Sequence, residues 1–142
     1  MAKVKATRIG NSLVHKDVLY GPMLSEKYAK DFLVGLEMAK ASGATQIWGE
    51  GPITKDSAPE NFLGDASEGV FMWPHVFVDV TEDMECFHEE IFGPVVTVVK
   101  AKDFELVGNL LQVILDVTCH TKPGDAEYNH LCSMHGNDNI GM

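Results

Sequence analysis

The chain has 142 residues, 45% of them hydrophobic and 23% charged, which suits one globular domain. Its formal net charge of -10 argues against nucleic acids and anionic membranes as partners, because both repel an acidic surface. No apolar run approaches the roughly 18 to 20 residues that span a bilayer, and residues 1–7 lack the apolar segment of a secretory signal. Three cysteines without an evident framework predict reduced thiols and a cytoplasmic location.

The first third of the sequence predicts a lead-in followed by one helix. Residues 1–24 contain turn-forming glycines and a proline in a polar connection. Ser25 is a suitable cap for an amphipathic helix over residues 25–41, and Gly43 is a suitable residue to follow its end. The apolar stripe of this helix is expected to consist of Tyr28, Phe32, Leu36 and Ala39.

Short strands are predicted after this helix. We expect strands at residues 44–48, 70–73 and 76–80, with a polar loop over 49–69 and a short helical turn opened by Thr81 or Asp83. A further strand at 95–101 is expected to be buried on both faces, because its apolar run hardly alternates. Asp103 would cap a second helix, and from Thr118 onward we expect loop or frayed tail. This order of elements predicts an α/β domain.

The most informative stretch is His88 to Val96. Two adjacent carboxylates lead into an aromatic residue, then a Gly-Pro pair that ends any preceding element, and then an apolar strand. A carboxylate and an aromatic ring are therefore expected at the entrance to a strand, which is a rigid place from which to present groups to a ligand.

These residues carry a family resemblance. Glu89–Val95 resembles the Glu-Glu-Ile-Phe-Gly-Pro-Val motif of the NAD(P)-dependent aldehyde dehydrogenases. Other segments resemble the same family in the same order over residues 7–106: Arg8–Asn11, Tyr20–Met23, Ala44–Gly51, Trp73–Met84 and Lys100–Asp103. The resemblance implies that the chain forms part of that family's catalytic domain, an α/β fold with a mostly parallel sheet flanked by helices. By this resemblance, residues 1–106 are the family-like segment, and residues 107–142 form a divergent helix followed by a loop-rich tail.

The resemblance also implies roles for two residues. Glu90 would accept hydrogen bonds from the ribose hydroxyls of the nicotinamide half of NAD or NADP, and Phe92 would pack beside that ribose and the ring. The alternative interpretation is a solvated surface acid at Glu90 and an ordinary core residue at Phe92.

Several parts of the family's machinery are not found among these residues. Its reaction needs a cysteine nucleophile, a nicotinamide that takes a hydride and a glutamate base that activates water. Cys86 has the wrong neighbours for the nucleophile, so no catalytic residue is assigned. Beyond residue 106 the family's Tyr-Gly-Leu and Pro-Phe-Gly-Gly segments are also missing, which a frame change, a fused segment or divergence would each explain.

Two alternative hypotheses for the function of this chain follow from these observations. The first is a fragment of an aldehyde dehydrogenase, inactive alone, whose parental enzyme oxidises a small aldehyde to a carboxylic acid with NAD(P). The second is a stand-alone, non-catalytic binding or assembly module that reuses the fold. Self-association is expected wherever an apolar strand such as 95–99 stays uncovered.

Other groups of residues give weaker indications of a functional site. The cysteines and histidines of the tail match no standard zinc spacing, and the acids between Glu82 and Glu90 lack the convergence of a calcium site, so no metal site is predicted. Gly49 and Gly51 are followed by no Lys-Ser/Thr pair, which indicates a plain turn rather than a phosphate loop. Given the negative charge, Trp48, Trp73, Phe71 and Phe77 are expected in the core rather than on a platform that stacks nucleic-acid bases.

Overall fold

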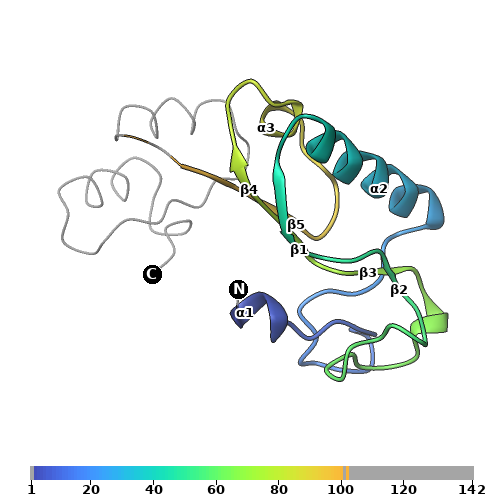
Figure 1. Cartoon of the computed structure of the whole chain (residues 1–142). Coiled ribbons are helices and arrows are strands. Elements are labelled where there is room, and N and C mark those ends of the chain that lie inside the picture. The colour runs from blue at the N-terminus through green and yellow to red at the C-terminus, as the bar shows by residue number, and fades with distance from the viewer. Residues whose placement is uncertain (1, 101, 103–142) are drawn as a thin grey trace, which may run out of the picture. The chain divides into compact units, whose positions relative to one another are not determined.

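The computed structural model describes residues 2–100 and 102 (Figure 1). The chain divides into two units, Met1–Val99 and Lys100–Met142. The helix predicted from Asp103, the tail and the division after residue 106 lie outside the described residues. The fold below is that of the first unit.

A three-stranded sheet forms the centre of this unit. Its strands are β1 (Thr45–Trp48), β4 (His75–Val80) and β5 (Val95–Val99), in the order β1-β4-β5. Strand β4 runs antiparallel to β1 and parallel to β5. The α/β class is confirmed, but the sheet is mixed rather than mostly parallel. The chain returns from β1 to β4 without a crossover helix, so these two strands are antiparallel. Between β4 and β5 it passes through the helical turn α3 (Glu85–His88), so these two strands are parallel.

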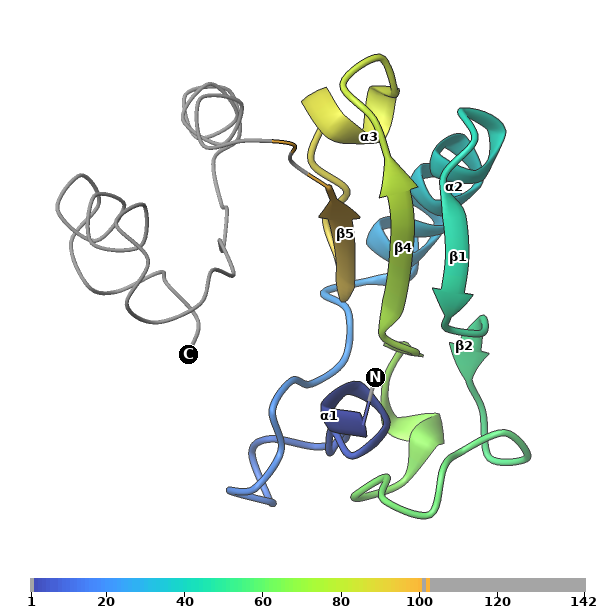
Figure 2. The same cartoon turned by 60° about the vertical axis from the view of Figure 1, so that its left-hand side comes forward.

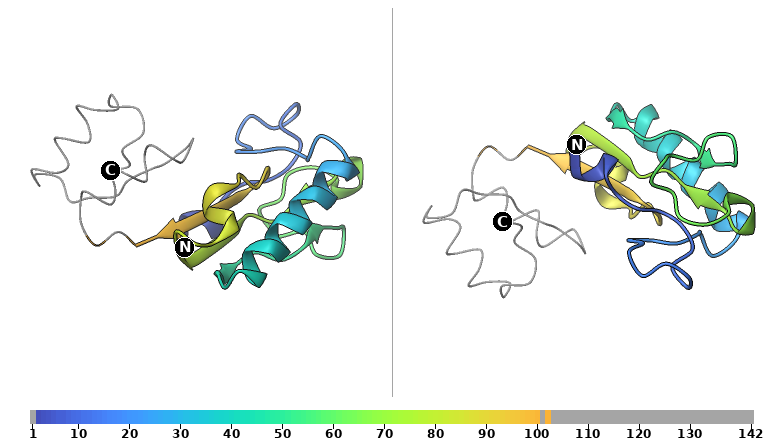
Figure 3. Two further views of the ribbon diagram at one scale, coloured as in Figure 1. Left: turned by 90° about the horizontal axis from the view of Figure 1, so that it is seen from above. Right: turned by 90° about the horizontal axis from the view of Figure 1, so that it is seen from below.

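Two helices cover one face of this sheet (Figures 2 and 3). They are α2 (Glu26–Ala41) and the single turn α3 (Glu85–His88). Phe32, Leu36 and Ala39 of α2 are at most 2% exposed, which confirms the predicted apolar stripe. The expectation that Tyr28 belongs to that stripe is wrong: it is 44% exposed, and Ala29 is buried instead.

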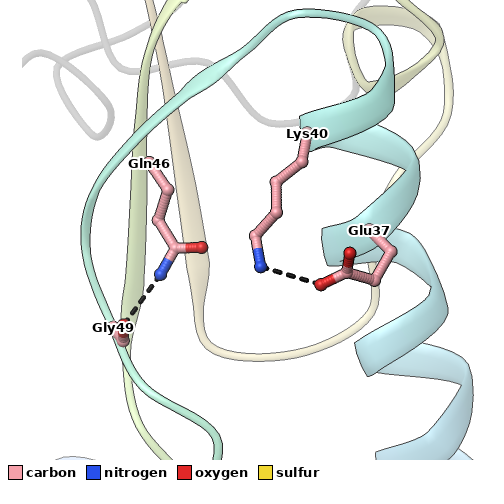
Figure 4. Close-up of polar contacts among 4 residues, drawn as sticks. All are labelled: Glu37, Lys40, Gln46 and Gly49. Atoms are coloured by element: carbon pink, nitrogen blue, oxygen red, sulfur yellow. Dashed lines mark hydrogen bonds and ion pairs between the residues drawn. The ribbon is translucent and has the colours of Figure 1, made fainter.

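The ends of α2 follow the sequence closely. Ser25 holds the N-cap position in extended backbone, although its side chain makes no capping hydrogen bond. Gly43 adopts a φ of +106°, a left-handed conformation that favours glycine and releases the chain into β1. The side chain of Gln46, within β1, donates to the carbonyl of Gly49, just past the end of the strand, at 2.7 Å and so closes the turn (Figure 4). On the facing part of α2, Lys40 pairs with Glu37 at 2.8 Å.

A second, smaller layer holds the predicted loop over 49–69. This segment contains a strand, β2 (Pro52–Ile53), which pairs antiparallel with β3 (Phe71–Met72), and the 3-10 turn η1 (Ala66–Glu68). The lead-in carries the short helix α1 (Ala2–Lys5) and also supplies core. Ile9 is 1% exposed and packs with Ile53 and Phe71, so residues 1–24 are more than a polar connection.

Strand β5 differs from expectation. Its side chains alternate between partly buried and exposed, with Val96 57% and Val98 42% exposed, so it is not buried on both faces. Among the described residues β5 is the last strand of the sheet, and α2 and α3 lie over the same face of that sheet. Its pairing with β4 slips between Phe77 and Val80, where Asp79 takes a φ of +58°.

His75 is the buried polar residue beneath α2. Its side chain is 2% exposed, its ring meets Phe32 edge-on at 5.5 Å, and its Nδ1 lies 2.8 Å from the carbonyl oxygen of Trp73. Burial lowers the pKa of His75 below its ordinary value, and the nearby Lys40 lowers it further. The folded protein therefore holds this imidazole neutral more strongly than the unfolded chain does.

This burial predicts a pH dependence of stability. Because the folded pKa is below the unfolded one, the contribution is complete above about pH 6.5 and is lost as the pH falls toward the folded pKa, by at most about 1.4 kcal/mol per pH unit. Urea unfolding at a series of pH values should show a shallower acid loss for His75→Gln. The exposed His88→Gln variant is the control and should keep the wild-type slope. Equal slopes for wild type and His75→Gln would contradict the assignment.

No helix within the described residues is long and apolar enough to cross a membrane.

Candidate functional site

Residues 89–94, called the motif loop below, join α3 to β5. The loop leaves the helix at Glu89, whose amide donates to the carbonyl of Glu85 at 2.9 Å. It then crosses over α2 and enters β5 through Gly93 and Pro94. Helix packing on one side and strand pairing on the other decide which side chains of the loop reach solvent.

Two glycines allow the motif loop to lie close to α2. A Cβ on Gly35 would stand 2.7 Å from Cγ2 of Ile91, and a Cβ on Gly93 would stand 2.3 Å from Cδ2 of Phe32. Gly93 also has a φ of +153°, which L residues rarely adopt. The loop therefore contacts the helix at two points, one on either side of Phe92.

The far end of the motif loop is fixed to the sheet by its backbone. The amide of His75, the first residue of β4, donates to the carbonyl of Pro94 at 2.8 Å. The amide of Val95 donates to the carbonyl of Gly93 at 2.8 Å. Helix α2 and strand β4 thus hold this end of the loop from two directions.

Between these anchors the loop presents Glu90 and Phe92. Both are exposed, Phe92 to 69%. Within the described residues neither side chain has a hydrogen-bond, ion-pair or ring partner. The interpretation of Phe92 as an ordinary core residue is therefore wrong, while a solvated Glu90 agrees with its exposure. An open carboxylate near an open aromatic ring can accept hydrogen bonds from hydroxyls and cover a flat apolar group.

The acidic residues before the loop do not converge. The Thr81 hydroxyl donates to the carboxylate of Asp83 and lowers the pKa of that group. In the described part of the chain, no group of three or more His, Cys, Asp or Glu side chains is placed to hold a metal ion. The cysteines and histidines of the tail lie outside the described residues.

Cys86 of α3 is the cysteine nearest the motif loop in sequence. It is 6% exposed, and burial raises the pKa of its thiol above the ordinary value. A buried thiol with a raised pKa is a poor nucleophile.

Two surface hollows lie elsewhere. The first, of about 570 Å³, is lined by residues 8, 14–17, 60, 61 and 63, with an ion pair of 3.0 Å between Arg8 and Asp17. The second, of about 270 Å³, is lined by residues 46–50 and Trp73 beside the edge-on pair of Trp48 and Trp73. Neither hollow includes a residue of the motif loop.

The structure adds positioning residues that the sequence pattern did not assign. Phe32 was expected only as a core residue, yet its ring also lies against the backbone of Gly93. Gly35 interrupts the middle of α2, where glycine is unfavourable by about 1 kcal/mol relative to alanine, and its contact with Ile91 explains it. A glycine inside an otherwise good helix was the available signal for a close approach.

Comparison with known proteins identifies the family. A sequence model of the Aldehyde dehydrogenase family matches residues 1–110. A vanillin dehydrogenase of Corynebacterium glutamicum is 41% identical over 85 residues, which cover 60% of this chain and 14% of that protein. A betaine aldehyde dehydrogenase of Rhizobium etli is 38% identical over 102 residues, 72% of this chain and 19% of that protein.

Solved structures agree with the sequence relatives. The crystal structure of a betaine aldehyde dehydrogenase from Staphylococcus aureus in complex with NAD+ has a TM-score of 0.73 and 25% identity, covering 93% of this chain and 25% of that one. The structure of an aldehyde dehydrogenase from Bacillus cereus has a TM-score of 0.65 and 27% identity, covering 93% of this chain and 24% of that one. The chain spans between 14% and 25% of these proteins' lengths. On this evidence the chain belongs to the aldehyde dehydrogenase family.

Proposed function

We propose that the motif loop forms the nicotinamide-ribose contact of an NAD(P) site. Glu90 accepts hydrogen bonds from the two ribose hydroxyls, and Phe92 packs beside the ribose and the nicotinamide ring. The observation that carries this proposal is that both side chains are exposed and unpartnered within the described residues, on a loop anchored at Ile91 and Gly93. Such a loop loses little conformational freedom when a ligand binds, which favours binding.

The parental reaction that this site serves is the oxidation of a small aldehyde to a carboxylic acid. The bound cofactor supplies the hydride acceptor. The residues of this chain hold and orient the ribose end, and none of the described residues is assigned as nucleophile or general base. We therefore propose that these 142 residues alone do not oxidise aldehydes.

Three further assignments belong to the same proposal. The odd number of cysteines, with Cys86 a free thiol, supports a cytoplasmic location. The NAD+ complex of the Staphylococcus aureus relative supports NAD as cofactor, with NADP as the alternative. The family match ends at residue 110, close to the expected boundary at 106, and this supports a divergent segment in the remainder of 107–142.

A pair of half-cofactors tests the ribose contact. Saturation-transfer NMR on the full chain should detect nicotinamide mononucleotide, with the strongest transfer to its ribose and ring protons, and should detect adenosine monophosphate far less. Glu90→Gln keeps the shape of the side chain but removes the charge that strengthens its hydrogen bonds. It should weaken the binding of nicotinamide mononucleotide roughly tenfold, which corresponds to about 1.4 kcal/mol.

The neighbouring Glu89→Gln is the matched control, because it makes the same change one residue away. It should leave binding at the wild-type level. Equal transfer to both half-cofactors, or equal loss in the two variants, would contradict the proposed role of Glu90.

A further inference from the structure

His75 contacts the motif loop through its backbone and supports the same loop through a neighbouring ring. Its amide donates to the carbonyl of Pro94, the last residue of the loop, at 2.8 Å. Its imidazole meets the ring of Phe32 edge-on, with 5.5 Å between the ring centroids. Phe32 in turn lies against the backbone of Gly93, where a Cβ would stand 2.3 Å from Cδ2 of that ring. His75 therefore holds the second anchor of the motif loop both directly and through Phe32.

The other sides of the His75 ring are also closely packed, and the residue is 2% exposed. A Cβ on Gly49 would stand 2.4 Å from Cδ2 of the imidazole, so the backbone that follows β1 lies directly against the ring. The carbonyl oxygen of Trp73 lies 2.8 Å from Nδ1, and the backbone of Glu50 makes a further hydrogen bond with the ring. Because protein interiors are close-packed, this ring cannot move toward water without displacing the groups that lie on it.

The charged groups around the ring do not supply a partner for an imidazolium among the described residues. From α2, Lys40 acts on the ring, and Lys40 itself pairs with Glu37 at 2.8 Å. Strand β5 places Val95 opposite His75, and the turn after β1 offers the backbone of Glu50. Both glutamates of the motif loop are exposed to solvent. Burial lowers the pKa of His75 most, hydrogen bonds to the two backbone groups act in the opposite direction, and Lys40 lowers the pKa further.

Protonation of His75 would place a positive charge in this packed position. A buried charge without an opposite partner is unfavourable, and the strain is relieved when the ring moves toward water. Such a movement removes the ring that supports Phe32 and disturbs the backbone that holds Pro94. The motif loop would then lose the rigidity that favours ligand binding.

We propose that His75 is a positioning residue for the motif loop, and that this loop holds the cofactor ribose only while the His75 ring is neutral. The inference rests on the proposed cofactor contact and adds its control by protons.

Linked equilibria give the size of the effect. The apparent dissociation constant equals the intrinsic constant divided by the fraction of chains in the competent state, here those with a neutral His75. The constant should therefore be about doubled at the pH where half of the His75 rings are protonated, and it should rise up to about tenfold for each further pH unit. Linkage is reciprocal, so the bound ligand must also make His75 harder to protonate.

Nicotinamide riboside is the probe for this test, because it carries the ribose and the ring but lacks a phosphate, which titrates near about pH 6. Saturation-transfer NMR on the full chain measures its dissociation constant from about pH 7.5 down to the midpoint of His75. Heteronuclear NMR of the labelled imidazole gives that midpoint in the same samples. The dissociation constant should be about doubled at the midpoint, and saturating nicotinamide riboside should move the midpoint to lower pH.

Two histidine variants separate positioning from a general effect of acid. His75→Gln keeps an amide that can donate to the carbonyl of Trp73 but cannot become charged. Whatever its affinity at about pH 7.5, that affinity should stay constant as the pH falls. His88→Gln, at the exposed histidine of α3, is the control and should keep the wild-type pH dependence. If His75→Gln does not fold, the two midpoints of wild type decide the question alone.

The outcomes distinguish this inference from the proposal on which it rests. Binding of nicotinamide riboside that is equally tight at about pH 7.5 and at the midpoint of His75, or a midpoint that saturating ligand leaves unmoved, would overturn the role of His75 alone. Failure of nicotinamide riboside to bind at any pH would overturn the cofactor contact itself.

Discussion

Gly93→Ala is expected to destabilise the folded chain by roughly 3 to 5 kcal/mol, or to prevent folding altogether. Two effects act together at this position. The new Cβ would stand 2.3 Å from Cδ2 and 2.6 Å from Cε2 of Phe32, a ring that is 1% exposed. The φ of +153° would also force an L residue into strained backbone.

The effect can be measured by urea unfolding, with Gly51→Ala as the control. A Cβ added to Gly51 would have no other atom within 4 Å, and the residue has no left-handed φ, so this variant should stay within about 1 kcal/mol of wild type. Glycine-to-alanine at residue 93 thus tests the close contact between the motif loop and Phe32. The same change at residue 51 reports only the general effect of replacing glycine by alanine. Equal stability of the two variants would mean that the motif loop does not lie on Phe32 as described.

The second large effect concerns catalysis. We expect the full 142-residue chain to form no NADH from an aldehyde and NAD+ above the uncatalysed rate. Family enzymes rely on a thiolate nucleophile and a base, and such machinery accelerates reactions at least about 10⁶-fold. Cys86, the described cysteine, is buried, and burial raises the pKa of its thiol.

NADH absorbance measures this directly, with a complete aldehyde dehydrogenase assayed beside the chain as the positive control. A variant with Cys86, Cys119 and Cys132 all replaced distinguishes a cysteine-dependent activity from contamination. Turnover that is present in the purified wild type and lost in this variant would contradict the proposal, and loss in Cys86→Ala alone would make Cys86 the nucleophile.

Local patterns allowed much of the fold to be predicted. The three- and four-residue spacing of Phe32, Leu36 and Ala39 located α2, because a helix that covers a sheet must bury one stripe. Gly43, with its left-handed φ, marked the end of that helix. Pro74 separated β3 from β4 for the same local reason, since proline removes a donor from a strand.

Features that depend on distant contacts were missed. The valines of β5 look alike in sequence, and only the packing of the strand in three dimensions decides that Val96 and Val98 are exposed. Ile9 is buried by residues more than forty positions away, Ile53 and Phe71, which no local pattern reveals. The direction of β4 relative to β1 likewise depends on how the intervening chain returns.

The sequence named the candidate residues of the motif loop but not the contacts that hold the loop in place. The motif named Glu90 and Phe92 through the family resemblance, and their role in binding a cofactor stays a prediction. The structure adds the reason that they protrude: Ile91 packs toward Gly35 and Gly93 packs toward Phe32, so the residues on either side of Ile91 face solvent. Sequence spacing alone does not contain these contacts, because they join the motif to a helix more than fifty residues earlier.

The most direct measurement is a titration of nicotinamide mononucleotide into the isotope-labelled full chain, followed by amide NMR. Binding through Glu90 and Phe92 predicts that the largest shift changes fall within residues 89–94 and that Glu90→Gln reduces them. Shift changes centred instead on the hollow beside Arg8 and Asp17, with residues 89–94 unmoved, would contradict the assignment of the motif loop as the cofactor contact.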